Sequence, residues 1–134
     1  MNIATQSATL SYNPLSRRQQ SFLNLAQRAA ESSECVQRHG AIIVRSGSVL
    51  SIGINKWRNK LTPTEDIFKN GRRCDLSVHA EVDALSRVAN PAGATLYVAR
   101  VRKDGRPALS KPCMQCDEAI REAGIIKVIY TIDN

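Results

Sequence analysis

Four residues in two short segments carry side chains that could bind a metal and move a proton: His79, Glu81, Cys113 and Cys116. The two cysteines are three residues apart at the expected start of a helix, so both sulfurs lie on the same side of its first turn. His79 adds a nitrogen, and thiolate and imidazole are ligands that zinc favours. The sequence therefore predicts Zn²⁺ held by His79, Cys113 and Cys116.

The number of protein ligands separates a catalytic zinc site from a structural one. A structural site fills all four positions with protein, whereas a catalytic site leaves one for water. Cys35, His39 or Cys74 could close the site, but a closed site would leave Glu81 without a task. Two thiolates and a neutral imidazole cancel the charge of the ion, so water there is acidified less than by three imidazoles. A carboxylate that accepts the proton compensates, which predicts Glu81 as the catalytic base.

Hydrophobic periodicity predicts the elements that must position these side chains. The expected elements are a helix at 16–33, strands at 41–44 and 49–55, a long loop at 56–75, a helix at 78–89, a strand at 95–99, a basic loop at 100–111, a helix at 113–123 and a strand at 128–132. Ser16 and Gln19 have the spacing of a capping box at the start of the first helix. Strands that alternate with helices imply an α/β fold in which helices cover a mixed sheet.

The length of 134 residues predicts one domain, which we place at 16–134 after a flexible tail at 1–15. The tail is polar and lacks the apolar stretch of a signal peptide. No apolar run approaches the ~20 residues of a membrane helix. We therefore expect a cytoplasmic protein with no membrane partner, in which the four cysteines are free or metal-bound.

Basic residues outnumber acidic ones by 19 to 12, and many lie in the two predicted loops. The charge is either solvated surface or a field that attracts phosphate, on a nucleotide or on a nucleic acid. Charge alone does not separate these partners. Lys56, Arg58 and Arg102 are our candidates for contacting the phosphate.

His-x-Glu followed by Pro-Cys-x-x-Cys resembles the known signature of zinc deaminases. The resemblance extends to segments that occur in the order usual for cytidine and deoxycytidylate deaminase-like proteins. These segments are Ala41-Ile42-Ile43-Val44, Gly53-Ile54-Asn55, His79-Ala80-Glu81-Val82-Asp83-Ala84-Leu85, Ala94-Thr95-Leu96-Tyr97-Val98 and Gly124-Ile125. The resemblance covers about residues 16–132 and implies a three-layer α/β/α cytidine-deaminase-like fold, with about four to five strands in a mixed sheet and helices on both faces.

The resemblance also implies a reaction. Activated water attacks the carbon that bears the exocyclic amine, which is C4 of cytosine or C6 of adenine. Glu81 takes the proton of the water, protonates the ring nitrogen and helps ammonia leave. Asn55 matches a strand-end asparagine that contacts substrate, although a simple turn residue is the alternative. The backbone of Ala80 is similar to the family's acceptor for the base edge.

Three functional hypotheses follow. The first is a hydrolytic deaminase of a cytosine nucleotide, dCMP-like, in nucleotide metabolism. The second is a polynucleotide deaminase acting on single-stranded DNA cytosine or tRNA adenosine. The segment before Pro112 is longer and more basic than in tRNA adenosine deaminases, so tRNA adenosine is the less favoured of these two substrates. The third is a non-catalytic, zinc-stabilised nucleic-acid-binding module. Many relatives continue past the last strand with elements that wall the pocket. Either a neighbouring subunit completes the pocket here, for which we expect a homo-oligomer, or the pocket is unusually open.

Overall fold

A computed structural model describes residues 3–6, 15–57 and 77–133. Its elements are β1 (Ile3–Gln6), α1 (Arg17–Glu31), β2 (Arg38–Arg45), β3 (Ser48–Ile54), β4 (Lys56–Trp57), β5 (Ser77–Val78), α3 (Ala80–Leu85), β6 (Thr95–Val101), β7 (Pro107–Ala108), α4 (Met114–Glu122) and β8 (Lys127–Thr131). The main sheet has the order β1-β8-β6-β2-β3, and β7 pairs with β6. The pairing of β6 with β8 is parallel and the others are antiparallel, so the sheet is mixed.

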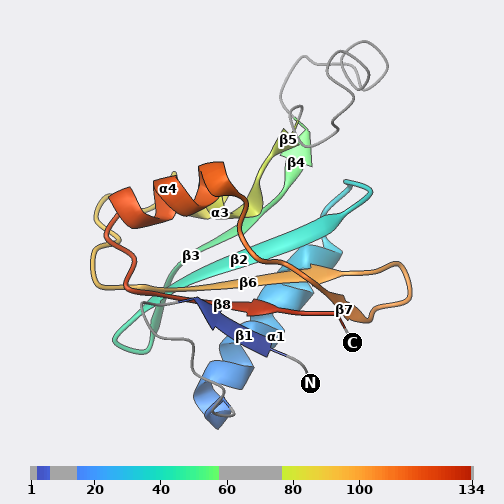
Figure 1. Ribbon diagram of the computed structural model, residues 1–134, viewed down its shortest axis with the longest axis horizontal. Coiled ribbons are helices and arrows are strands. Elements are labelled where there is room, and N and C mark those ends of the chain that lie inside the picture. The colour runs from blue at the N-terminus through green and yellow to red at the C-terminus, as the bar shows by residue number, and fades with distance from the viewer. Residues whose placement is uncertain (1–2, 7–14, 58–76, 134) are drawn as a thin grey trace.

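Helices cover both faces of this sheet (Figure 1). On one face, Leu23 and Ala26 of α1 pack with Ile42 and Tyr97. The other face carries α3 and α4, and its core residues are Ala41, Ile43, Ala80, Ala84, Ala94, Leu96, Val98, Cys116, Ile120, Val128 and Tyr130. Alternate residues of each strand point to opposite faces, so each strand contributes to both cores. The predicted three-layer α/β/α arrangement is confirmed.

Several predicted elements have the expected form. At the start of α1, the backbone N–H of Gln19 donates to the hydroxyl of Ser16 at 3.1 Å, and the N–H of Ser16 donates to the Gln19 side chain at 3.0 Å. Strands β2 and β3 form the expected hairpin. Ser46 and Gly47 turn the chain with φ of 52° and 78°, a conformation that glycine adopts readily.

Other elements differ from the prediction. The segment expected as a tail contains β1, which pairs with β8, and the basic loop contains β7. Helix α3 ends at Leu85, although we expected helix to residue 89. The Ser86 hydroxyl donates to the carbonyl of Asp83 at 2.7 Å, and the next N–H groups bond three residues back, which tightens the chain into turns. Most of the predicted loop at 56–75 lies outside the described residues. None of the described helices is long and apolar enough to cross a bilayer.

Helix α3 lies unusually close to strand β3 at Gly53. A Cβ atom added there would lie 2.4 Å from the carbonyl oxygen of Ala80 and 2.5 Å from the backbone nitrogen of Ala84. The hydroxyl of Ser51, on the same strand, donates to the Ala84 carbonyl at 2.8 Å. The missing side chain at Gly53 therefore sets the depth at which α3 packs on the sheet.

Gly53→Ala should destabilise the protein by about 1–3 kcal/mol, because the methyl group meets helix backbone that cannot move aside cheaply. Urea unfolding measures the change. Gly105→Ala is the control: its φ is 86° but nothing lies within 4 Å of an added Cβ, so it reports backbone strain alone. Equal losses for the two variants would contradict the close approach of α3.

Candidate metal centre

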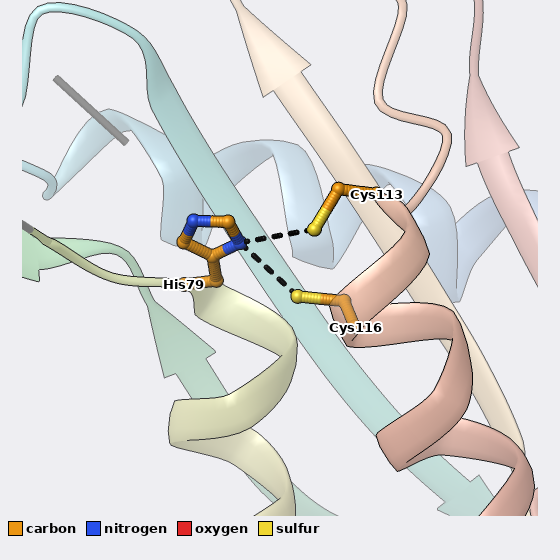
Figure 2. Close-up of side chains that lie close together, drawn as sticks. All are labelled: His79, Cys113 and Cys116. Atoms are coloured by element: carbon orange, nitrogen blue, oxygen red, sulfur yellow. Dashed lines mark hydrogen bonds between the residues drawn. The ribbon is translucent and has the colours of Figure 1, made fainter. Parts of the chain in front are cut away.

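The predicted ligands His79, Cys113 and Cys116 meet at the N-termini of two helices. His79 is the N-cap of α3, Cys113 is the N-cap of α4, and Cys116 lies in the first turn of α4. The Nδ1 atom of His79 lies 3.1 Å from Sγ of Cys116 and 3.6 Å from Sγ of Cys113. Figure 2 shows the imidazole and both sulfurs turned toward a common point between the two helices. The three ligand atoms all lie within 4.8 Å of one another.

These distances fit one zinc ion. Tetrahedral zinc with bonds of about 2.0–2.1 Å to nitrogen and about 2.3 Å to sulfur places nitrogen and sulfur about 3.5 Å apart. In the described part of the chain, no further His, Cys, Asp or Glu joins this group of three. Cys35 and His39 are therefore not fourth ligands, while Cys74 lies outside the described residues. An arrangement of three protein ligands leaves one position open for a reacting molecule.

Asp83 fixes helix α3, and with it His79, to the end of strand β3. Its carboxylate is buried and accepts the N–H of Ile54 at 3.1 Å. Lys56 lies 2.9 Å from the same carboxylate and Arg87 lies 3.4 Å away. Burial raises the pKa of Asp83, but the hydrogen bonds from Lys56 and Ile54, with the charges of Lys56 and Arg87, outweigh it, so its pKa is lowered.

Ser110 and Thr131 fix the segment that leads to Cys113. The Ser110 hydroxyl donates to the carbonyl of Val98 at 2.9 Å, and its N–H donates to the carbonyl of Thr131 at 2.9 Å. The Thr131 hydroxyl donates to the carbonyl of Ala108 at 2.6 Å. Both side chains are buried, so these bonds are protected from water and hold the start of α4 against β6 and β8.

Glu81 lies in the first turn of α3 with 4% of its surface exposed. Burial raises its pKa, and its own backbone N–H, His79 and a hydrogen bond to Cys116 oppose the increase. The carboxyl group therefore faces the ligand cluster, as the sequence analysis required. Burial also raises the pKa of the Cys116 thiol, and the neighbouring Glu81 and Cys113 add to the increase. A carboxyl group beside the ligands can accept a proton from one molecule and donate it to another.

The predicted substrate contacts are Asn55, which follows the end of β3, and Ala80, which directly follows the ligand His79 in the chain. Asn55 is buried, its Oδ1 accepts the N–H of His39 at 2.8 Å, and its Nδ2 donates to the carbonyl of Gln37 at 2.5 Å. One N–H of the amide is not used in these bonds. Ala80 is the first residue of α3 and is fully buried. Asn55 thus joins β2 to the end of β3, whichever group it contacts in a substrate.

The predicted phosphate contacts are positioned differently. Lys56 pairs with Asp83, as described above. Arg102 lies 3.0 Å from Asp133 and belongs to the β6–β7 connection, which extends away from the N-termini of α3 and α4 (Figure 1). Arg58 lies outside the described residues. The structure therefore brings neither Lys56 nor Arg102 to the cluster as a free cation.

Sequence analysis did not identify a role for His39 beyond a possible ligand. Burial lowers the pKa of His39 to about 4, and the charges of Arg100 and His79 lower it further. Its ring is therefore neutral and lies near both of those residues. The predicted strand at 95–99 is two residues shorter than β6, which ends at Val101. A prediction to Val101 would have included Arg100 in the strand, where it pairs with His39 and projects to the same face.

Removal of one ligand should abolish stoichiometric zinc. His79→Ala and Cys113→Ser each leave two ligands, too few to hold the ion. The check is zinc content by atomic absorption after dialysis, with about one ion per chain expected in the wild type. Cys35→Ala removes a buried thiol outside the cluster and should keep its zinc. Full zinc content in Cys113→Ser would refute the ligand assignment.

Asp83→Asn should cost about 1–3 kcal/mol at about pH 7, because it removes the charged acceptor of Lys56. The lowered pKa of Asp83 means that its contribution is complete above the ordinary pKa of about 3.9 and is lost as the pH falls through its lower value in the folded state. The difference between wild type and variant should therefore shrink toward about pH 3. Urea unfolding at several pH values tests this, and a constant difference would disprove it.

Comparison with known proteins agrees with the fold and the cluster. The sequence matches the profile of the cytidine and deoxycytidylate deaminase zinc-binding region over residues 16–132. It is 31% identical over 125 residues to deoxycytidylate deaminase of Saccharomyces cerevisiae, covering 82% of this chain and 36% of the yeast protein. The chain thus spans about a third of the length of this curated relative.

Solved structures share the fold. The dCMP deaminase of cyanophage S-TIM5 in apo form has a TM-score of 0.62 and 22% identity, covering 83% of this chain and 80% of the phage chain. The cytidine deaminase of Burkholderia pseudomallei has a TM-score of 0.56 and 18% identity, covering 82% and 78%. The matched region is a zinc-binding one, and its cofactor, zinc, suits the three side chains that meet here. This chain belongs to the cytidine and deoxycytidylate deaminase zinc-binding family.

Proposed function

We propose that this chain is a zinc-dependent hydrolytic deaminase that converts a cytosine nucleotide, dCMP-like, to the uracil nucleotide and ammonia. The observation that carries the proposal is the buried carboxyl of Glu81 beside a cluster of three ligands with an open fourth position. The relatives support the substrate: one is a deoxycytidylate deaminase, and the S-TIM5 enzyme has been solved in complex with dCMP and dUMP.

The proposed mechanism assigns the proton transfers to Glu81. When bound, zinc supplies the Lewis acid that activates water. Glu81 accepts a proton from the water and delivers it to N3 of the cytosine ring as the oxygen joins C4. It then takes the second proton of the former water and passes it to the amine, so that the C4–N4 bond breaks, ammonia departs and the oxygen on C4 becomes a carbonyl. Water supplies the oxygen of the uracil carbonyl, and Glu81 ends in its starting protonation state.

The surroundings of Glu81 suit this role. Its side chain is shielded from bulk water, so protons pass to the substrate rather than to solvent. The carboxyl also lies next to Cys116 and His79, so it is close to the position that the three ligands leave open. The buried backbone at Ala80 and the remaining amide N–H of Asn55 are the groups that we assign to the substrate.

The two alternatives are less well supported. A polynucleotide deaminase would use cations to follow a phosphate backbone, and three cations of the basic segments that the structure describes, Lys56, Arg102 and Arg106, each pair with an aspartate instead. A non-catalytic binding module gives no reason to bury a carboxyl beside the ligand cluster. Cytoplasmic location and assembly into homo-oligomers remain predictions. The exposed apolar side chains of Met114 and Ile126 would suit a contact between subunits.

Glu81→Gln should retain zinc and lose ammonia release by about 100- to 10,000-fold, because the amide cannot carry the proton. The measurement is ammonia release from dCMP, together with zinc content. Glu118→Gln makes the same change at an exposed position of α4 and should retain both properties. Wild-type turnover by Glu81→Gln would refute the mechanism.

A substrate panel tests the rest of the proposal. Ammonia release is compared for dCMP, CMP, dCTP, deoxycytidine, cytosine, guanine, a single-stranded oligonucleotide and an adenosine-containing RNA hairpin. The highest kcat/KM is expected for a cytosine monophosphate. Preference for either polymer, with binding that weakens steeply with salt, would favour the polynucleotide alternative instead.

A further inference from the structure

Three polar residues form a row across neighbouring strands: Asn55 after β3, His39 on β2 and Arg100 on β6. The register pairs His39 with Arg100. The N–H of Asn55 donates to the carbonyl of His39 at 3.2 Å, which continues the β2–β3 register by one residue. Residues directly opposite each other in antiparallel strands project to the same face. The three side chains therefore share one face of the sheet.

This face is the one that carries the metal cluster. The register pairs Ala41 with Val98, and both pack in the core beneath α3 and α4. His39 and Arg100 lie two residues farther along the same strands, so they point to the same side of the sheet. Arg100 and His79 both lie close enough to His39 for their charges to lower its pKa.

The register places the cation Arg100 on this face, opposite His39. Its charge lowers the pKa of both His39 and Asp133. Other cations of the two basic segments are positioned differently: Lys56 pairs with Asp83, Arg102 with Asp133, Arg106 with Asp104, and Lys103 and Lys111 are exposed. Arg100 itself is only partly exposed, so a charge partner there is less screened by solvent.

The backbone of Arg100 is fixed on both sides. Its residue pairs with His39 of β2 and with Ala108 of β7. Its N–H donates to the hydroxyl of Thr131 at 3.2 Å. The backbone of Arg100 is therefore anchored, so less entropy is lost when its guanidinium binds an anion.

We infer that Arg100 binds the 5′-phosphate of the substrate and is the residue that selects a nucleotide over a nucleoside. This inference rests on the proposed function, because it assumes that the cytosine base binds next to Glu81 while the phosphate binds at Arg100. Arg100 lies one strand away from His39, on which the charge of His79 also acts, and neighbouring strands lie about 4.8 Å apart. This spacing suits a ligand whose reacting ring and anionic group lie at opposite ends. Guanidinium groups bind phosphate oxygens in pairs, which gives direction as well as charge.

The experiment measures binding and turnover separately. Calorimetry compares dCMP with deoxycytidine on zinc-loaded Glu81→Gln protein, which should bind without turning over, and on the double variant Glu81→Gln/Arg100→Gln. Loss of the charged contact should weaken dCMP binding by about 10- to 100-fold and leave deoxycytidine unchanged. In the otherwise wild-type protein, Arg100→Gln should lower kcat/KM for dCMP by a similar factor and leave the zinc content intact. Arg28→Gln, an exposed cation on α1 across the sheet, is the matched control and should change neither.

The outcomes separate this inference from the proposed function. Equal dCMP affinity with and without Arg100 would overturn the inference, and so would an equal loss for dCMP and deoxycytidine or a failure of the protein to bind dCMP at all. Arg100-dependent binding of dCMP without ammonia release would support the inference and contradict the proposed function. If Arg100→Gln releases ammonia from dCMP as fast as the wild type, the proposed function is supported and the inference about Arg100 is contradicted.

Discussion

The close packing of helix α3 on strand β3 is the constraint on which the site depends. It is possible because Gly53 has no side chain, and the carboxylate of Asp83 then joins the helix to the end of the strand. The N-terminus of α3 consequently lies at a fixed height above the sheet. His79 and Glu81, two residues apart, can both face the cluster only because they lie at that helix end, before the helical turn separates them.

The second half of the cluster is positioned independently. Ser110 and Thr131 hold the chain that leads into α4, so Cys113 and Cys116 arrive from a separate element. A metal that needs both halves is bound tightly only when α3 and α4 are packed on the same face, so zinc binding and folding of this layer are coupled. Burial of polar side chains at these junctions has a free-energy cost, which their hydrogen bonds offset. The same buried environment keeps the Glu81 carboxyl away from water.

The sequence was sufficient to predict the layers of the fold and the three side chains that meet at the helix ends, but not the contacts between elements. His79 and the two cysteines have residue types and spacing that only a few chemistries need, and strand and helix periodicity gave the order of elements. Sequence analysis placed Arg100 in a loop because the predicted strand ended at residue 99, whereas β6 continues to Val101. Asp83 gave no local signal, because its partners lie on another strand. Strand β1 was missed because pairing with β8, rather than hydrophobic pattern, defines it.

Zinc K-edge X-ray absorption on the purified protein tests the central claim most directly, because it reads the ligands without reference to activity. The account predicts one zinc with two sulfur neighbours at about 2.3 Å and two nitrogen or oxygen neighbours at about 2.0–2.1 Å. The multiple scattering should fit a single imidazole, from His79, so that one position is left for an exchangeable oxygen. A shell of three or four sulfurs, or a fit that requires two imidazoles, would mean a closed structural site and would contradict the account.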